Sequence, residues 1–258
     1  MSEAFYEPAG DGRLVATPLT RGPWSPDAQH GGPPAGLLGR ALERCDPRPD
    51  ARIARATFDF LRPVPLGPLT VEARVVRPGR RVALLGATLS ADGVEVMRGH
   101  AWRIRTLPLG VEETRRPAPS PPDTADGSAD YLPVADVGYH TGMEWRFVAG
   151  DWRSLGPSIV WLRMRVPLVA GEDPTPLQRV LVAADCGNGV SAMVDYGTHV
   201  YINPDLTVAL HREPTGDWVA LDASTSISSD GIGQASSVIS DREGVIGRGH
   251  QSLLIDPR

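Results

Sequence analysis

Gln251 is the first residue in this sequence with a chemical implication, because it breaks an internal repeat. The run Arg98-Gly99-His100 recurs 150 residues later as Arg248-Gly249-His250, and an acidic residue followed by glycine, typical of a hairpin turn, precedes both copies. The next residue differs, being Ala101 in the first copy and Gln251 in the second. If Leu253 faces inward on this strand, Gln251 does too, and a buried amide needs hydrogen-bonding partners. Only the second copy could therefore hold a water or another polar group at this position.

His30, Gly31 and Gly32 form a second candidate site, at the start of an apolar helix. Prolines follow immediately and suit a first helical turn, and apolar residues then recur at helical spacing up to about residue 44. The unpaired N–H groups and the dipole of a helix start favour negative charge. His30 could act as a base, but a cap or a partner within the fold explains a histidine here equally well.

The elements that would position these residues occur twice along the chain. Residues 33–44 predict a buried helix, and period-two patterns predict strands from residue 53, over 69–77, 81–90 and 94–105. Later patterns predict strands over 137–148 and 158–166, a helix over 176–186, and four more strands between 199 and 256. Helices followed by antiparallel strands indicate an α+β fold of two tandem units. We predict units over residues 1–107 and 131–258, joined by a proline-rich linker over 108–130.

Composition excludes several classes of protein. The chain has 258 residues, 41% of them hydrophobic, and a net charge of −5 without a basic stripe, which argues against a nucleic-acid-binding surface. Cys45 and Cys186 have no spacing typical of a zinc site, so we expect neither metal nor cofactor. Neither a secretory signal nor an apolar run of about 20 residues is visible. We therefore expect a cytoplasmic protein without membrane contact.

Four short motifs resemble those of one enzyme family. They are His-Gly-Gly at 30–32, Phe-Asp-Phe-Leu-Arg-Pro at 58–63, Asn-Pro-Asp-Leu-Thr-Val-Ala-Leu-His-Arg at 203–212, and residues 244–251. With them the chain resembles the acyl-CoA thioesterase II-like branch of the double-hotdog thioesterases. The resemblance implies two hotdog units, each a long helix wrapped by an antiparallel sheet. It also implies a homodimer and a role in lipid metabolism through hydrolysis of acyl-CoA or related thioesters.

The resemblance further implies three catalytic residues in the second unit, an Asp, a Gln and a Thr or Ser that hold a water. Asp205, Gln251 and Thr225 fit these roles, while counting along the strand favours Ser226 over Thr225. An aspartate can orient or deprotonate water, and a neutral amide and hydroxyl can fix its other hydrogen bonds. We also expect Ser226 near the substrate.

We also expect His30, Gly31 and Gly32 to bind the substrate. Backbone N–H groups for the developing oxyanion would come either from Gly31 and Gly32 or from the helix start near Pro176. The first unit has Ala101 where the second has Gln251, and Arg55 or Ala56 where the second has Asp205. We therefore predict one active site per chain.

Other readings remain open at this stage. Asp205 follows Asn-Pro and could be a turn residue, and Thr225 could be ordinary strand sequence. The main alternative function is a non-catalytic protein that binds acyl groups or other hydrophobic ligands. A hydratase of the related fold would use an Asp/His pair, which is not found after Pro176.

Overall fold

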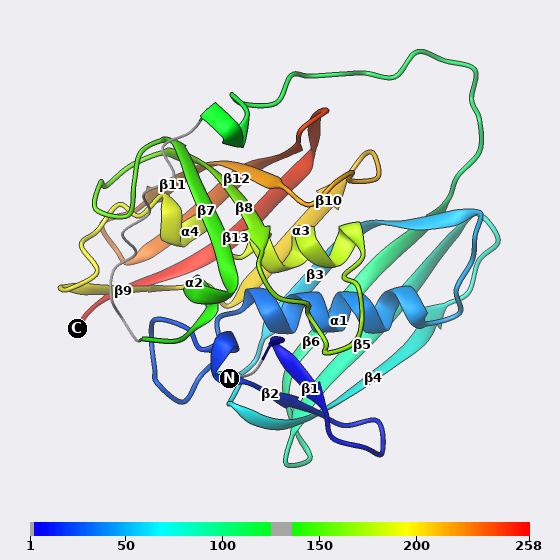
Figure 1. Ribbon diagram of the computed structural model, residues 1–258, viewed down its shortest axis with the longest axis horizontal. Helices are drawn as coiled ribbons and strands as arrows, with labels where there is room; N and C mark the ends of the chain where they lie inside the picture. The colour runs from blue at the N-terminus through cyan, green and yellow to red at the C-terminus, as the bar shows by residue number, and fades with distance from the viewer. Residues whose placement is uncertain (1–2, 125–135) are drawn as a thin grey trace.

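The computed structural model describes residues 3–124 and 136–258, which form one antiparallel sheet with helices against it (Figure 1). In that part of the chain the sheet has 13 strands, in the order β1-β2-β4-β5-β6-β3-β10-β13-β12-β11-β8-β7, with β9 paired to β13. The strands are β1 (Tyr6–Pro8), β2 (Leu14–Ala16), β3 (Ala51–Phe60), β4 (Gly67–Arg77), β5 (Val82–Ala91), β6 (Val94–Arg105), β7 (Met143–Ala149), β8 (Ser158–Met164), β9 (His199–Ile202), β10 (Asp205–Leu210), β11 (Val219–Ile227), β12 (Ile232–Asp241) and β13 (Gly244–Pro257). The helices are η1 (Pro18–Thr20), α1 (Gly32–Arg44), η2 (Pro122–Thr124), α2 (Tyr139–Gly142), α3 (Pro176–Ala184) and α4 (Gly187–Val190).

The two units join through β3 and β10, near the middle of the sheet. Thr207 lies opposite Thr57 in this antiparallel pair and donates a hydrogen bond to it, Oγ1 to Oγ1, over 3.1 Å. His100 pairs with Thr57 on one side, and His250 pairs with Thr207 on the other. The residues 150 apart in sequence are thus related by a local two-fold axis. This arrangement confirms the double-hotdog fold.

The helices α1 and α3 pack closely against each other in front of the sheet (Figure 1). They are antiparallel, because Glu43 near the end of α1 contacts Thr175 before α3, while Gly32 at the start of α1 contacts Val182 near the end of α3. A Cβ on Gly39 would lie 2.3 Å from Leu181 Cδ1, so glycine is required there for the close approach. The apolar composition of both helices follows from their burial between each other and the sheet.

Three details differ from the sequence prediction. Four strands were expected between 199 and 256, and five are observed, because Asn203 and Pro204 interrupt one strand and separate β9 from β10. The helix expected over 176–186 ends at Ala184, and the short helix α2 precedes β7 within the strand expected over 137–148. In the predicted linker, residues 108–124 carry only η2 and residues 125–130 lie outside the described part.

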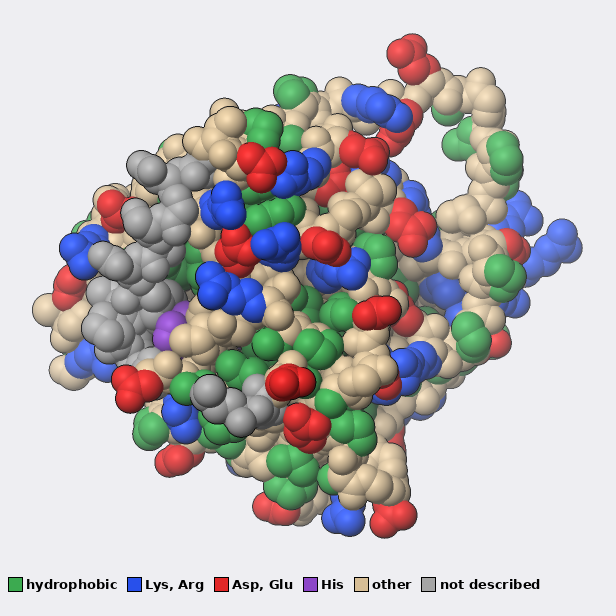
Figure 2. Space-filling model, viewed as in Figure 1, with side chains coloured by type: hydrophobic (Ala, Val, Ile, Leu, Met, Phe, Trp, Pro, Cys, Tyr) green, Lys and Arg blue, Asp and Glu red, His purple; other side chains and the backbone are tan. Residues whose placement is uncertain are grey.

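On the face shown in Figure 2, arginine side chains are interspersed with Asp and Glu side chains. None of the helices in the described residues is both long enough and apolar enough to cross a bilayer.

Candidate active site

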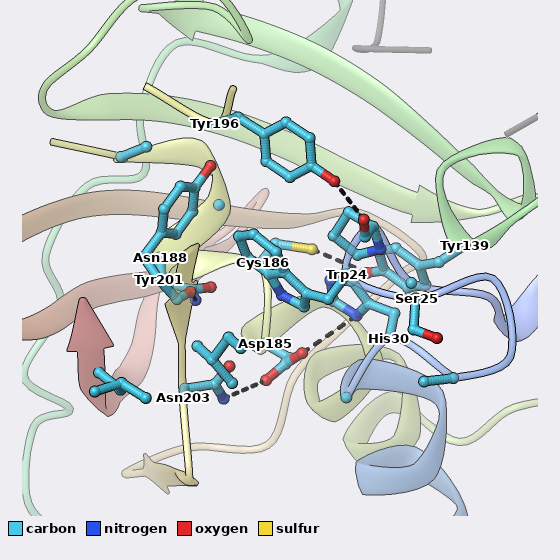
Figure 3. Close-up of a pocket in the computed structure, with 18 of the residues that line it drawn as sticks. Trp24, Ser25, His30, Tyr139, Asp185, Cys186, Asn188, Tyr196, Tyr201 and Asn203 are labelled. Atoms are coloured by element: carbon cyan, nitrogen blue, oxygen red, sulfur yellow. Dashed lines mark hydrogen bonds and ion pairs between the residues drawn. The ribbon is translucent and has the colours of Figure 1, made fainter. Parts of the chain in front are cut away.

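Asp185 lies at the centre of the only cluster in the described residues that joins Gln251 to the start of α1. It is the C-cap of α3, and only 4% of it is exposed. Its Oδ1 accepts a hydrogen bond from Asn203 Nδ2 at 2.8 Å (Figure 3). It also accepts one from Gln251 Nε2 at 3.2 Å. Its Oδ2 lies 3.2 Å from His30 Nδ1. The carboxylate is thus contacted from both units.

Gln251 is held in one orientation by the backbone around it. Its Oε1 accepts a hydrogen bond of 3.0 Å from the Asn188 N–H, and its Nε2 also donates to the Asp185 carbonyl at 3.1 Å. A Cβ on Gly187 would lie 2.9 Å from Gln251 Oε1, so glycine leaves room for the amide. With Oε1 occupied by an N–H, the amide can only present its NH₂ group to Asp185.

The start of α1 approaches the same carboxylate from the opposite side. The Gly32 N–H donates a hydrogen bond of 3.0 Å to His30 Nδ1, and the backbone N–H groups of Gly31 and Gly32 lower the pKa of Asp185. A Cβ on Gly31 would lie 2.6 Å from Asp185 Oδ2, and one on Gly32 only 2.3 Å from the Val182 carbonyl oxygen. Packing against the backbone therefore requires glycine at position 32, while a side chain at position 31 would displace the Asp185 carboxylate or the Phe60 ring. The two glycines place a helix start beside an acid.

Burial sets the protonation of Asp185 and His30. Desolvation raises the pKa of Asp185 to about 7, although hydrogen bonds from Asn203, Gln251 and the two glycines oppose the rise. Desolvation, followed by the charge of His140, lowers the pKa of His30 to about 3. His30 is therefore neutral near pH 7, and the pair carries at most one negative charge. A carboxyl group with a pKa near 7 is suited to accept and return a proton.

A cavity of about 970 Å³ opens beside this cluster and is lined by residues of both units, including His30, Gly31, Asp185 and Asn203. The His30 ring stacks on the Tyr139 ring, with centroids 3.9 Å apart and an angle of 8° between the planes. The Tyr139 hydroxyl donates to the Val182 carbonyl at 2.8 Å. His30 is thus fixed between Tyr139 and Asp185, and a ligand in the cavity would reach both.

Asp205 lies away from this cluster. Its carboxylate accepts hydrogen bonds from the Ser252 N–H at 2.6 Å and from Ser252 Oγ at 3.1 Å. Ser252 is exposed and follows the buried Gln251, so alternation along β13 places Asp205 and Gln251 on opposite faces of the sheet. The expected convergence of Asp205 with Gln251 is not observed.

The two candidate hydroxyl groups also lie outside the cavity. Thr225 is buried on the inner face of β11, where its Oγ1 is 2.7 Å from Ser191 Oγ. Ser226 is exposed on the opposite face. Neither lines the cavity, whereas His30 and Gly31 do, and Gly32 contacts Asp185. The structure thus brings together four of the seven expected residues: Gln251, His30, Gly31 and Gly32.

Sequence reasoning missed Asp185 and Asn203, the two residues that complete the cluster. Asp185 directly follows the apolar run Val180 to Ala184. An acid at the end of an otherwise apolar buried helix is a signal, because burying a carboxylate is costly without partners. Asn203 was quoted only as part of a motif, and its side chain joins Asp185 to the backbone carbonyl of Asp205.

The cluster provides a carboxylate, two amide groups and a helix start beside an apolar cavity. Among the described residues, no group of three or more His, Cys, Asp or Glu side chains is arranged to hold a metal ion. The residues present can activate a water and stabilise a developing oxyanion in a largely desolvated place.

Comparisons with known proteins cover nearly the whole chain. The N-terminal domain model of acyl-CoA thioesterases matches residues 20–104, and the C-terminal domain model matches residues 112–255. No curated protein sequence matches significantly.

Solved structures share the fold at low sequence identity. A putative thioesterase II from Thermobifida fusca is 21% identical with a TM-score of 0.76, over 98% of this chain and 96% of that one. A putative thioesterase from Novosphingobium aromaticivorans is 22% identical with a TM-score of 0.72, over 98% of both chains. An acyl-CoA thioesterase II from Mycobacterium marinum is 17% identical with a TM-score of 0.70, over 98% of this chain and 96% of that one.

Proposed function

Because the chain belongs to the acyl-CoA thioesterase family, we propose that it hydrolyses acyl-CoA or related thioesters with Asp185 as the residue that activates water. Gln251 and Asn203 orient the Asp185 carboxylate through their amide NH₂ groups. Asp185 takes the role that the sequence suggested for Asp205, and Asn203 contributes the neutral polar group expected of Thr225 or Ser226. Hydrolysis of a thioester needs no cofactor.

The reaction balances with these groups alone. Asp185, ionised above a pH of about 7, accepts a proton from a water in the cavity as the water oxygen bonds to the thioester carbonyl carbon. When the tetrahedral intermediate collapses, the C–S bond breaks, and the proton on Asp185 passes to the departing thiolate. The products are a carboxylic acid and a free thiol, and the carboxylate of Asp185 is regenerated.

The start of α1 is the proposed site for the oxyanion. The N–H groups of Gly31 and Gly32 and the positive end of the α1 dipole lie beside Asp185. The helix start near Pro176 is the other candidate, but it lies at the opposite end of the helix pair, where Thr175 and Gln178 bind Glu43. We therefore assign the oxyanion to the Gly31 N–H at this helix start, because the Gly32 N–H donates to His30 Nδ1.

The single observation that supports this function best is the convergence of Asp185, Gln251 and Asn203 beside a large cavity. Asp185→Asn tests it, because asparagine keeps the shape but cannot accept the proton. We expect kcat for thiol release from a panel of acyl-CoAs to fall by about 10³-fold. Asp205→Asn is the matched control, and its kcat should stay within about twofold of the wild type, as for most surface substitutions.

The outcomes separate the alternatives. Loss of activity in Asp205→Asn with retention in Asp185→Asn would reverse the assignment. Binding of acyl-CoA without release of thiol by the wild-type protein would instead support the non-catalytic alternative. The homodimer, the cytoplasmic location and the role in lipid metabolism remain predictions, and light scattering on the purified protein would check the first.

A further inference from the structure

The cavity beside Asp185 is unusually rich in aromatic side chains. The chain contains fifteen Phe, Trp and Tyr residues, from 4 Phe, 6 Trp and 5 Tyr, and seven of them line this one cavity. The cavity is lined by only 33 of the 258 residues, so aromatic side chains are concentrated there about fourfold. Flat, rigid rings are therefore enriched in the lining of this cavity.

Three of these rings form one wall of the cavity, defined by Trp24, Tyr196 and Tyr201. The Trp24 ring is 5.2 Å from Tyr196 and 4.9 Å from Tyr201 between centroids, and it meets Tyr201 edge to face at 88°. The Tyr196 hydroxyl donates to the Pro23 carbonyl, and the Arg258 guanidinium lies over both Trp24 and Tyr196. These contacts fix the rings, so the wall is formed before a ligand enters.

Further aromatic side chains that line the cavity pack around His30. Tyr139 stacks on His30 and meets Trp145 edge to face, at 5.9 Å and 82°. In the view of Figure 3, Trp24 lies between Tyr201 and the pair His30–Asp185. A group attached to a carbonyl at Asp185 would thus meet aromatic faces at once.

Tyr201 adds a polar group to this wall. It is only 7% exposed and lines the cavity, and its hydroxyl makes no hydrogen bond within the part of the chain that the structure describes. Burial raises the pKa of Tyr201 to about 12, so the group is a neutral phenol that can donate a hydrogen bond. The hydroxyl thus belongs to a residue that lines the cavity, and it can donate to a polar group of a ligand there.

A rigid aromatic wall favours some acyl groups over others. A planar ring gains offset-stacked or edge-to-face contacts with fixed aromatic neighbours, and it loses few rotatable bonds on binding. A linear alkyl chain gains only dispersion contacts and loses more conformational freedom. A polar substituent on the ring would also pair with the Tyr201 hydroxyl, which an alkyl chain cannot do.

We propose that the acyl group of the substrate carries an aromatic ring with a hydrogen-bonding substituent, bound against the wall of Trp24, Tyr196 and Tyr201 with the substituent at the Tyr201 hydroxyl. This inference rests on the proposed thioester hydrolysis for its readout, and it extends that function from thioesters in general to aryl-substituted ones.

Hydrolysis of matched thioesters tests the inference. Phenylacetyl-CoA and octanoyl-CoA have the same number of acyl carbons and differ in the ring, and hydroxyphenylacetyl-CoA isomers add the polar substituent. We expect kcat/KM to be about tenfold higher for phenylacetyl-CoA than for octanoyl-CoA, with a further rise of about tenfold for the best hydroxylated isomer.

Two variants connect the preference to the wall. Trp24→Leu should abolish the preference for the ring, while Trp102→Leu, which changes a tryptophan of β6 outside the cavity, should leave the ratio unchanged. Tyr201→Phe should raise KM for the hydroxylated isomer about tenfold and leave phenylacetyl-CoA unaffected. Tyr201→Phe removes one hydroxyl and keeps the ring, so this variant tests recognition of the substituent rather than folding.

The outcomes distinguish the preference for an aromatic acyl group from the proposed thioester hydrolysis itself. Equal or faster hydrolysis of octanoyl-CoA would overturn the inference and leave thioester hydrolysis intact. If no thioester is hydrolysed, the proposed function fails, and calorimetric titration with free hydroxyphenylacetates then decides the inference alone. Binding that Tyr201→Phe weakens supports it, and no binding overturns it.

Discussion

The two ends of the α1–α3 pair make the same contact with different results. At one end, Asp185 of α3 meets the start of α1 at Gly31 and Gly32. At the other end, Glu43 of α1 meets the start of α3, where it accepts hydrogen bonds from Thr175 Oγ1 at 2.9 Å and from Gln178 Nε2 at 2.8 Å. Burial raises the pKa of both acids.

The difference lies in the residues at the two helix starts. The side chains of Thr175 and Gln178 donate hydrogen bonds to the Glu43 carboxylate. Glu43 lines neither the large cavity beside Asp185 nor the smaller one near Glu172, among the described residues. Gly31 and Gly32 have no side chains, and their end opens into the large cavity. A buried acid at a helix start is thus not sufficient for chemistry, and accessible space beside it is what separates the two ends.

Among the substitutions that compare the two ends, the one that fills the space beside Asp185 should lower kcat most. Gly31→Ala adds a Cβ that would lie 2.6 Å from Asp185 Oδ2 and 2.7 Å from the Phe60 ring, so the carboxylate must move. We expect kcat to fall by about 10²-fold. Gln178→Ala at the other end should leave kcat within about twofold. Steady-state thiol release measures both, and equal losses would remove the distinction between the ends.

Gln251→Ala should lower kcat by a similar factor. It removes the donor to Asp185 Oδ1 and leaves the Asn188 N–H without its acceptor. Hydrogen bonds to charged groups stabilise by about 1.5–3 kcal/mol, which corresponds to a loss of about 10- to 150-fold in kcat. Gln251→Glu keeps the acceptor for Asn188 but brings a second carboxyl to Asp185, and it should not restore activity. Full activity in Gln251→Ala would remove Gln251 from the site.

The pH profile should follow the Asp185 end alone. Asp185 has a pKa of about 7 and must be ionised to accept a proton, so kcat/KM should fall about tenfold per pH unit below that value. Glu43→Gln should leave the profile unchanged, although the pKa of Glu43 is also raised. A profile that is flat between pH 5 and about 8 would contradict the assignment of Asp185 as the base.

The smallest effect concerns stability. The pKa of Asp185 rises from an ordinary value of 3.8 to about 7 on folding, so its contribution to stability is fully present below about pH 4 and is lost as the pH rises through 7. Asp185→Asn avoids this loss, and we expect its melting temperature to exceed that of the wild type by a few degrees at about pH 8. The gap should close toward about pH 4 in thermal scans. A gap that widens on acidification would contradict the raised pKa.

Much of the fold could be predicted from local pattern. The alternation of β3 to β6, the turn at Asp92 and Gly93 with its positive φ angles of 49° and 76°, and the Arg-Gly-His repeat all reflect short-range rules. The contact of the Asn203 side chain with Asp185 could not be predicted this way, because the two residues belong to different elements and only the fold brings them together.

The site was predictable only in part, for a related reason. Gln251 stood out because the repeat holds alanine at the equivalent position, and the glycines at 31 and 32 stood out because they begin a helix. Asp185 did not, because the repeat spacing of the strands does not carry over to the helices. Asp205 was favoured because it lies in a conspicuous motif, but the motif carries no information on which face of β10 its side chain occupies.

The hydrogen bond between Thr57 and Thr207 has a consequence for how such a molecule can diversify. In an assembly of two identical chains, every substitution appears at both helix ends, so glycines that open one end open the other as well. Covalent fusion removes this constraint. The end at Asp185 can then keep space for a substrate, while the end at Glu43 is closed by side-chain contacts. The two units also depend on each other. Separating them would expose the edge of β3, ten residues long, and the edge of β10, six residues long, and exposed strand edges pair with other chains.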